Sequence, residues 1–335
     1  MTLSLIISSC ILQKSSHLEA LTSDFSDETN KESKIKKVKR FLDSKWNGYH
    51  DYYLPFIETF LSNIAHQKEL IFIIDGTQSA GNCMTLMLSV LWKGYAVPVA
   101  WLVKEAGKGH FSEEKHMELL EAVKEIIPEG SRNILLGDGE FDGKKLREKL
   151  QKTGFEYVLR TSKDKLIKNE CDEADRFENQ THGFENGQYL FENACENSHA
   201  VYWKSKKYNN PIYLLTNLEV AGLACAYYKK RFKIELLFKQ LKSAGFNLQR
   251  SKLEGEKRCC NLMMILAFAF IFCFCLGIML KNEKKYIINT FYRFDRIKTI
   301  KPLTLAQKCL TSALDLALQI FHKWTRNFQC IFVYG

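Results

Sequence analysis

The sequence predicts an α/β protein built on a mixed sheet flanked by helices, interrupted by a β-rich insertion and preceded by a small helical region. Three observations favour this class. The chain has 335 residues with 46% hydrophobic content, enough for a sizeable core. Buried-strand runs alternate with amphipathic helices over 67–161, and a polar segment with short alternating runs follows over 162–210.

The N-terminal region, residues 1–66, is expected to be helical and basic. Residues 1–30 carry no clear period and are expected to be loosely ordered. In "KESKIKKVKRFLDS" an apolar stripe of Ile35, Val38 and Leu42 lies on a strongly basic helix, and "LPFIETFLSNIAH" starts a second helix at Pro55. The basic helix face is open to two interpretations, DNA contact or simple solvation.

Residues 67–161 are expected to form the first part of a catalytic core. The apolar run Leu70 to Ile74 predicts a buried strand that stops at Asp75-Gly76. Two further strand-like runs, "CMTLMLSVLWKG" and "YAVPVAWLVKE", precede a helix that opens at Ser112, and "NILLGD" predicts a buried strand ending in Asp138. With "GKKLREKLQKTG" as helix and "FEYVLRT" as strand, the order is β-β-β-α-β-α-β, that of a ribonuclease-H-like mixed sheet.

Three segments complete the chain. Residues 162–210 predict the β-rich insertion, residues 211–282 the second part of the core, and residues 283–335 a C-terminal helical region containing "TLAQKCLTSALDLALQIFHKW". The stretch 262–280, "LMMILAFAFIFCFCLGIML", has no charge and is long enough to span a membrane. We expect a core helix there and no membrane partner, since a wholly buried helix has the same composition.

Composition points to a polyanionic partner in a reducing compartment. The formal charge is +10, which favours nucleic acid because neutralised phosphates release counterions. The cysteines form no Cys-x-x-Cys pair, so a structural zinc site is not expected. The apolar start "MTLSLIISSC" lacks a positive n-region, so we expect a cytoplasmic protein rather than an exported one.

The stretch "YKKRFKIELLFKQLK", residues 228–242, holds one acid among many basic residues. On a regular helix its polar face gathers Tyr228, Arg231, Glu235 and Lys242, and its apolar stripe gathers Ile234, Leu237, Phe238 and Leu241. Glu235 would then lie at the rim of the core, able to meet Asp75 and Asp138. Three carboxylates together require a divalent cation, and oxygen ligands suit Mg²⁺ or Mn²⁺, with two ions expected for phosphodiester chemistry. Tyr228, Arg231 and Lys242 would hold DNA phosphates.

These residues resemble a known family. The spacing Tyr228-x2-Arg231-x3-Glu235-x6-Lys242 is similar to the Tyr-Arg-Glu-Lys signature of bacterial insertion-sequence DDE transposases of the fourth insertion-sequence group, and "IDGT" and "GDGEF" resemble its two aspartate motifs. The resemblance covers residues 68–280.

The resemblance implies a DNA transposase with Asp75, Asp138 and Glu235 as catalytic metal ligands. Such enzymes cleave at terminal inverted repeats, and the freed 3′-hydroxyl attacks the opposite strand or target DNA. It further implies a homodimer on paired DNA ends, a nucleoid-associated location, and an insertion aromatic that holds a flipped base, for which Trp203 is the candidate by position.

Plainer interpretations stay open at several positions. Each aspartate could be an ordinary turn residue, Trp203 could be a packing residue, and Glu140 and Asp142 are expected to be solvated loop acids. Gly139 stands where the family often has arginine. Because the N-terminal region is short for the family, the main alternative is a truncated, catalytically inactive DNA-binding remnant; a membrane protein is a third.

Overall fold

The computed structural model describes residues 2–25, 28–65, 69–106, 109–169, 172–282 and 301–312. The strands are β1 Glu69–Gln78, β2 Cys83–Trp92, β3 Tyr95–Glu105, β4 Arg132–Gly137, β5 Glu156–Arg160, β6 Leu166–Lys168, β7 Ala174–Arg176, β8 Gly187–Cys195, β9 Ser198–Lys204 and β10 Ile212–Thr216. The helices are α1 Thr2–Gln13, α2 Lys31–Asp43, α3 Tyr49–Tyr52, α4 Leu54–Ala65, α5 Glu113–Lys124, α6 Lys144–Lys152, α7 Phe177–Gln180, α8 Ala221–Arg231, α9 Lys233–Lys239, α10 Glu256–Asn282 and α13 Pro302–Ser312. Three short turns of helix are η1 Ala20–Thr22, the π-helical η2 Gln240–Ala244 and η3 Leu248–Arg250.

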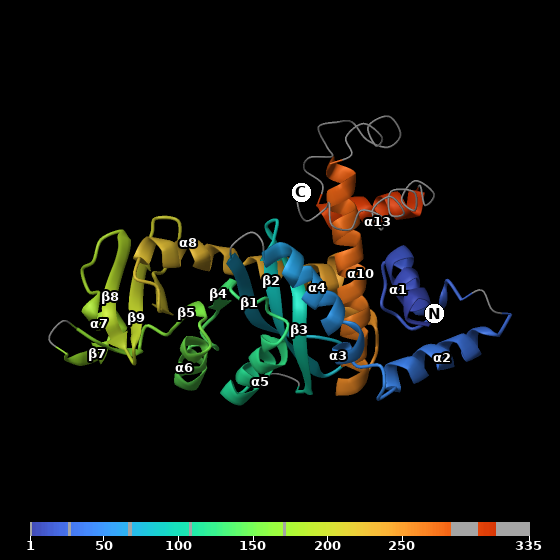
Figure 1. Cartoon of the computed structure of the whole chain (residues 1–335), viewed down its shortest axis with the longest axis horizontal. Helices are drawn as coiled ribbons and strands as arrows, with labels where there is room; N and C mark the ends of the chain where they lie inside the picture. The colour runs from blue at the N-terminus through green and yellow to red at the C-terminus, as the bar shows by residue number, and fades with distance from the viewer. Residues whose placement is uncertain are drawn as a thin grey trace.

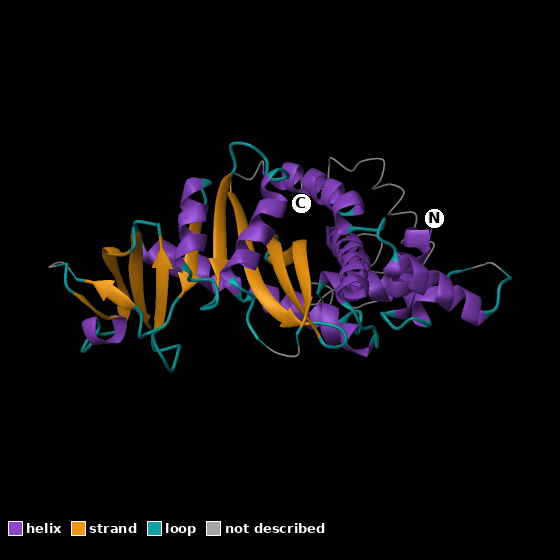
Figure 2. Ribbon diagram, turned by 90° about the horizontal axis from the view of Figure 1, so that it is seen from below, coloured by secondary structure: helices purple, strands orange, loops and turns teal. Residues whose placement is uncertain are grey.

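One eight-stranded sheet organises the protein, in the order β3-β2-β1-β4-β5-β10-β9-β8. β1, β2 and β3 pair antiparallel, whereas β4 lies parallel to β1 and β5 parallel to β4. This is the ribonuclease-H-like order predicted from the sequence, and the fold class is confirmed. Figure 1 shows α8 along one side of this row of strands and α5 and α6 along the other, and the strands run in a single row in Figure 2.

The insertion is β-rich, as predicted, but it does not form a separate layer. β8 and β9 continue the main sheet through β10, which pairs antiparallel with β5. Side chains on one face of these strands make a small second core with β6 and α7, formed by Ile167, Phe177, Ala194, Cys195, Ala200, Tyr202 and Leu215. The boundaries proposed for the five segments stay predictions.

α10 is the long apolar helix expected from the sequence. It is long and apolar enough to cross a membrane, but 83% of its most apolar window is buried inside the protein. It packs against β3, α1, α2 and α13, and Trp101 of β3 donates to the carbonyl of Cys260 at 3.2 Å. The helix therefore lies in the core and joins the N-terminal helices to the sheet (Figure 1).

Three local expectations were wrong. Residues 2–13 are not loosely ordered but form α1, whose Ile6 and Cys10 are fully buried. β1 does not stop at Asp75 but continues to Gln78, because pairing with β2 extends to Gln78 and Met84. The signature stretch is not one regular helix, as described below. Of the C-terminal helical region predicted over 283–335, only residues 301–312 are described, and residues 283–300 and 313–335 lie outside the described residues.

Candidate active site

Asp75 lies within β1, opposite Met87 of β2, with its side chain 15% exposed. Burial and the negative charge of Asp138 raise its pKa to about 6, against the opposing pull of Arg231. Glu235 adds a smaller effect in the same direction as Asp138. Asp75 therefore lies in the field of both other predicted ligands.

Asp138 follows directly after β4. β1 and β4 run parallel, and the last paired residues are Ile73 and Leu136; Asp75 and Asp138 each come two residues later, so they lie level on neighbouring strands. Asp138 folds back into a tight turn: its Oδ1 accepts the N–H of Glu140 at 3.0 Å, and its carbonyl accepts the N–H of Phe141 at 3.1 Å. The turn fixes the backbone that carries this carboxylate.

The signature stretch is broken at Phe232, between α8 and α9, and continues into the π-helical η2. Phe232 keeps near-helical dihedral angles (φ −60°, ψ −7°), so Arg231 and Glu235 remain neighbours one turn apart. The apolar stripe is buried as predicted, with Ile234 and Leu237 at 0% and 2% exposure.

Arg231 links the two chain segments of the site. Its guanidinium, 8% exposed, donates from Nη1 to Asp75 Oδ2 at 3.2 Å and from Nη2 to Glu235 Oε1 at 3.1 Å. Glu235 is 56% exposed, so its carboxylate also faces solvent. One buried cation thus connects a strand carboxylate with a helix carboxylate.

The other two signature residues, Tyr228 and Lys242, lie near the contact between Arg231 and Asp75. Tyr228 is 1% exposed and its hydroxyl makes no hydrogen bond of normal geometry with a described residue, although the Arg231 guanidinium lies 5.9 Å from its ring. Lys242, on the π-helical turn, has a pKa lowered by burial and partly restored by Asp75. Arg231, Glu235 and Lys242 therefore act on Asp75 in spite of the break, and Tyr228 lies next to Arg231.

The donor set fits a divalent cation. Among the described residues no group of three or more His, Cys, Asp or Glu side chains forms a ready-made metal cage. However, the charges of Asp138 and Glu235 add to burial in raising the pKa of Asp75, so a hard cation would relieve part of this cost, and carboxylate oxygens are the ligands that such cations prefer. Arg231 supplies positive charge between Asp75 and Glu235 in the present arrangement.

Trp203 is placed by the structure inside the core. Its side chain is 4% exposed, Tyr208 contacts its ring edge-on at 5.1 Å, and the ammonium group of Lys229 lies 5.0 Å from its ring centre. A base could stack on this ring only after Tyr208 or Lys229 moved. Its base-holding role stays a prediction.

Two loop acids that were expected to be solvated are engaged instead. Glu140 accepts from the N–H of Phe111 at 2.6 Å and contacts His110 Nδ1 at 2.7 Å and His116 Nε2 at 3.3 Å. Burial raises its pKa, but these hydrogen bonds outweigh burial and lower the pKa to about 2. Asp142 accepts from Thr161 Oγ1 at 2.5 Å. Neither network could be read from the sequence, since the partners are distant along the chain.

The sequence also gave no indication of an open cleft beside Asp138. It runs from the Asp138 turn to the start of the insertion and to the loop before β10, and it is lined by Asp138, Gly139, Arg160, Thr161, Ser162, Lys163, Asn210, Pro211 and Tyr213. In hindsight, a weak pointer is the "LRTSK" run at the end of β5, because β5 neighbours β4 and the run carries Arg160 and Lys163.

Comparison with known proteins defines the class. A family profile described as "Transposase DDE domain" matches residues 67–272, which include the three carboxylates, the insertion and most of α10. The chain belongs to the DDE transposase family and is an enzyme of this DNA-cleaving class.

Two solved structures show weaker likeness. The piggyBac transposase synaptic complex with hairpin DNA aligns over 97% of this chain and 84% of its own, with 12% identity and a TM-score of 0.42. Endonuclease V of Ciona intestinalis, solved with a 24mer DNA containing an inosine followed by a ribo-adenosine, aligns over 57% of this chain and 99% of its own, with 13% identity and a TM-score of 0.32. No curated protein matches the sequence.

Proposed function

We propose that this transposase belongs to the group with the Tyr-Arg-Glu-Lys signature, and that it cuts the terminal inverted repeats of a mobile element and joins the freed 3′-hydroxyl to DNA. The observation that carries the proposal is Arg231, which donates to Asp75 of β1 and to Glu235 of α9 and feels the charge of Asp138 at the end of β4. Hydrolysis would break the bond between the 3′ oxygen and phosphorus, with water supplying the new oxygen of the 5′-phosphate. In strand transfer the freed 3′-hydroxyl would form a bond to a target phosphorus while the target's own bond between that phosphorus and its 3′ oxygen breaks, leaving a 3′-hydroxyl on the target strand.

Asp75, Asp138 and Glu235 would hold Mg²⁺ or Mn²⁺, with two ions expected, which when bound would polarise the attacking and leaving oxygens. Arg231 fixes Asp75 relative to Glu235 before DNA arrives. Tyr228, Arg231 and Lys242 lie next to the carboxylates, where a hydroxyl and two cations can position phosphate oxygens. The protein would act as a homodimer on paired ends, in the cytoplasm at the nucleoid.

The test is nicking of a plasmid that carries the inverted repeats flanking the gene. We expect nicking that requires Mg²⁺ or Mn²⁺ and is reduced at least about a thousandfold in Glu235→Gln, because a charged ligand is lost. Glu219→Gln, at an exposed position just before α8, is the matched control and should retain wild-type nicking. Unchanged nicking by Glu235→Gln would refute the ligand assignment, and a wild-type protein that binds the ends without nicking them would be the inactive remnant.

A further inference from the structure

Arg147 of α6 is a buried cation outside the carboxylate site. Its side chain is 2% exposed, and a guanidinium in such a position requires acceptors for its N–H groups. Nε donates to the carbonyl of Asp142 at 3.2 Å, and Nη1 donates to the carbonyl of Cys195 at 3.2 Å and to Ser198 Oγ at 2.5 Å. Nη2 donates to Glu196 Oε2 at 2.5 Å.

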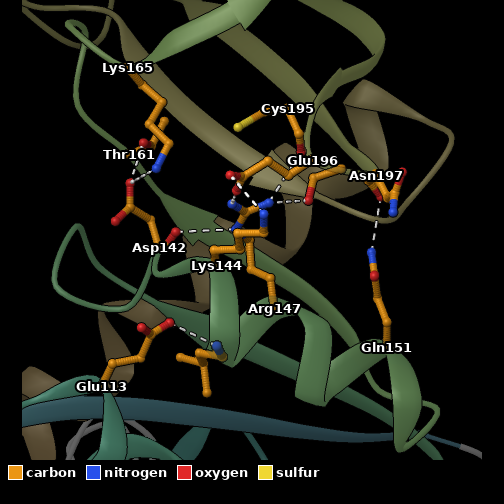
Figure 3. Close-up of polar contacts among 12 residues, drawn as sticks. Glu113, Asp142, Lys144, Arg147, Gln151, Thr161, Lys165, Cys195, Glu196 and Asn197 are labelled. Atoms are coloured by element: carbon orange, nitrogen blue, oxygen red, sulfur yellow. Dashed lines mark hydrogen bonds and ion pairs between the residues drawn. The ribbon is translucent and has the colours of Figure 1, made fainter.

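These acceptors come from two separate parts of the chain. Asp142 ends the turn that begins at Asp138, whereas the other three belong to the turn between β8 and β9 in the insertion. Figure 3 shows Arg147 between these two segments, with Gln151 of the same helix donating to the carbonyl of Asn197 at 3.0 Å beside it. The helix therefore holds the hairpin tip against the loop that carries Asp138.

The hairpin turn is built for this contact rather than for its own stability. Glu196 and Asn197 both have positive φ, 47° and 61°, between the paired residues Cys195 and Ser198. Two-residue turns of this kind favour Asn-Gly, and a left-handed glutamate costs roughly 1 kcal/mol. The conformation directs the Glu196 carboxylate onto Arg147, with Lys144 a further 3.6 Å contact.

Asp142 also contacts the start of the insertion. Its carboxylate accepts from Thr161 Oγ1 at 2.5 Å and lies 3.6 Å from Lys165 Nζ, while its carbonyl accepts from Arg147. Between Asp138 and Asp142 stands Phe141, fully buried, whose N–H donates to the Asp138 carbonyl. The turn 138–142 is thus held at its far end through Arg147 to the hairpin of the insertion, through Lys165 to the start of the insertion, and through Thr161 to the residue just before it.

We propose that Arg147 and Glu196 are positioning residues that fix the Asp138 turn to the insertion, so that the Asp138 carboxylate and DNA held by the insertion keep one relative placement. The proposal rests on the proposed role of Asp138 as a metal ligand. Neither residue touches the carboxylate itself; both act through Asp142 and the turn. Hydrogen bonds suit this purpose because each requires a defined distance and direction between donor and acceptor.

The experiment separates positioning from simple fold support. The double variant Glu196→Asn with Asn197→Gly places favoured residues in the turn, so the hairpin should be at least as stable while the ion pair with Arg147 is lost. Arg147→Met is the second variant. Arg132→Met is the matched control, because Arg132 pairs with Glu156 at 2.7 Å on the same sheet and contacts neither loop.

Three readouts decide the matter: amide hydrogen exchange at Glu140 and Phe141, Mn²⁺ affinity measured without DNA by electron paramagnetic resonance, and thermal unfolding. In the double variant we expect exchange at these two amides to rise about tenfold and Mn²⁺ affinity to fall about tenfold, with the unfolding temperature close to that of the wild type because the favoured turn offsets the acceptor that Arg147 loses. In the control variant Arg132→Met, amide exchange and Mn²⁺ affinity should equal the wild-type values.

Wild-type exchange and affinity in the double variant would overturn the proposal, as would faster exchange spread evenly over β1 and β4 in Arg147→Met. Asp138→Asn keeps this result distinct from the proposed function. If Asp138→Asn retains Mn²⁺ affinity and nicking, the ligand assignment fails; if it loses both while the double variant matches wild type, only the positioning role fails.

Discussion

Arg231 offsets the negative charges of Asp75 and Glu235, which the fold places close together. Burial and, after it, the charge of Asp138 raise the pKa of Asp75, with a smaller contribution from Glu235, and Arg231 opposes this increase. A residue that binds both carboxylates before any cation arrives keeps the site folded, and the same guanidinium remains available to a DNA phosphate. The signature arginine thus has a structural role in addition to the phosphate role expected of it.

The first prediction concerns the pH dependence of stability in EDTA. The pKa of Asp75 is about 6 in the folded protein, above its ordinary 3.8, so its contribution to stability is fully present below pH 3.8 and is lost as the pH rises through 6. The free energy of unfolding of Asp75→Asn should therefore rise relative to that of the wild type as the pH rises, by about 3 kcal/mol at pH 8. Urea unfolding between pH 4 and 8 measures the difference; a constant difference would contradict the raised pKa.

The second prediction concerns the Tyr228 hydroxyl, which is buried without a hydrogen bond of normal geometry to any described residue. Tyr228→Phe should leave the free energy of unfolding unchanged or raise it by about 1 kcal/mol, because an unpaired polar group is removed. Nicking should nevertheless fall, because the hydroxyl is expected to serve a phosphate. Tyr227→Phe is the control: that hydroxyl donates to Glu69 Oε2 at 2.6 Å, so its removal should lower stability and spare nicking. Nicking by Tyr228→Phe at the wild-type rate would show that the Tyr228 hydroxyl does not bind a DNA phosphate.

At the scale of elements, strands and buried stripes were predictable, whereas interruptions and docking contacts were not. Apolar runs located β1, β4 and β5, because burial on both faces leaves a local signature. The break at Phe232 and the π-helical turn at Lys242 have no such signature; each depends on how the helix packs against the sheet. Spacing and expected strand ends predicted the three carboxylates, whereas the contacts of Arg147 join residues too distant in sequence to be paired by pattern.

The third prediction concerns the start of α6. Its N-cap is Gly143, which has no side chain to cap the helix, and Glu113 of α5 does so instead by accepting the N–H of Leu146 at 2.8 Å (Figure 3). A methyl group on Gly143 would lie 2.2 Å from Glu113 Oε1 and displace it. Gly143→Ala should therefore lower the free energy of unfolding by about 1–2 kcal/mol.

Gly139→Ala is the control for this change, because nothing lies within 4 Å of the added carbon. It should unfold at the wild-type urea concentration. Equal midpoints for Gly143→Ala and the wild type would show that Glu113 does not cap α6.

At the scale of the whole molecule, α10 connects the N-terminal helices with the sheet. Asn261 donates to the carbonyl of Leu42 at 2.8 Å, and Arg258 pairs with Asp43 through Nη2 at 2.9 Å, so α2 is held by polar contacts as well as by apolar packing. The basic surface of α2, with Lys36, Lys39 and Arg40, is thereby fixed relative to the catalytic sheet.

The last prediction follows from the burial of α10 and decides between the core-helix and membrane interpretations of its sequence. Since 83% of its apolar window is covered by the protein itself, little apolar surface remains for lipid. The protein, expressed without detergent, should stay in the supernatant after high-speed centrifugation and should not float with added liposomes. Its buried thiols at Cys259, Cys273 and Cys275 should react with a maleimide only after denaturation, as burial also raises their pKa values. Recovery in a carbonate-resistant membrane fraction, with α10 thiols labelled in native protein, would show that the helix leaves the core.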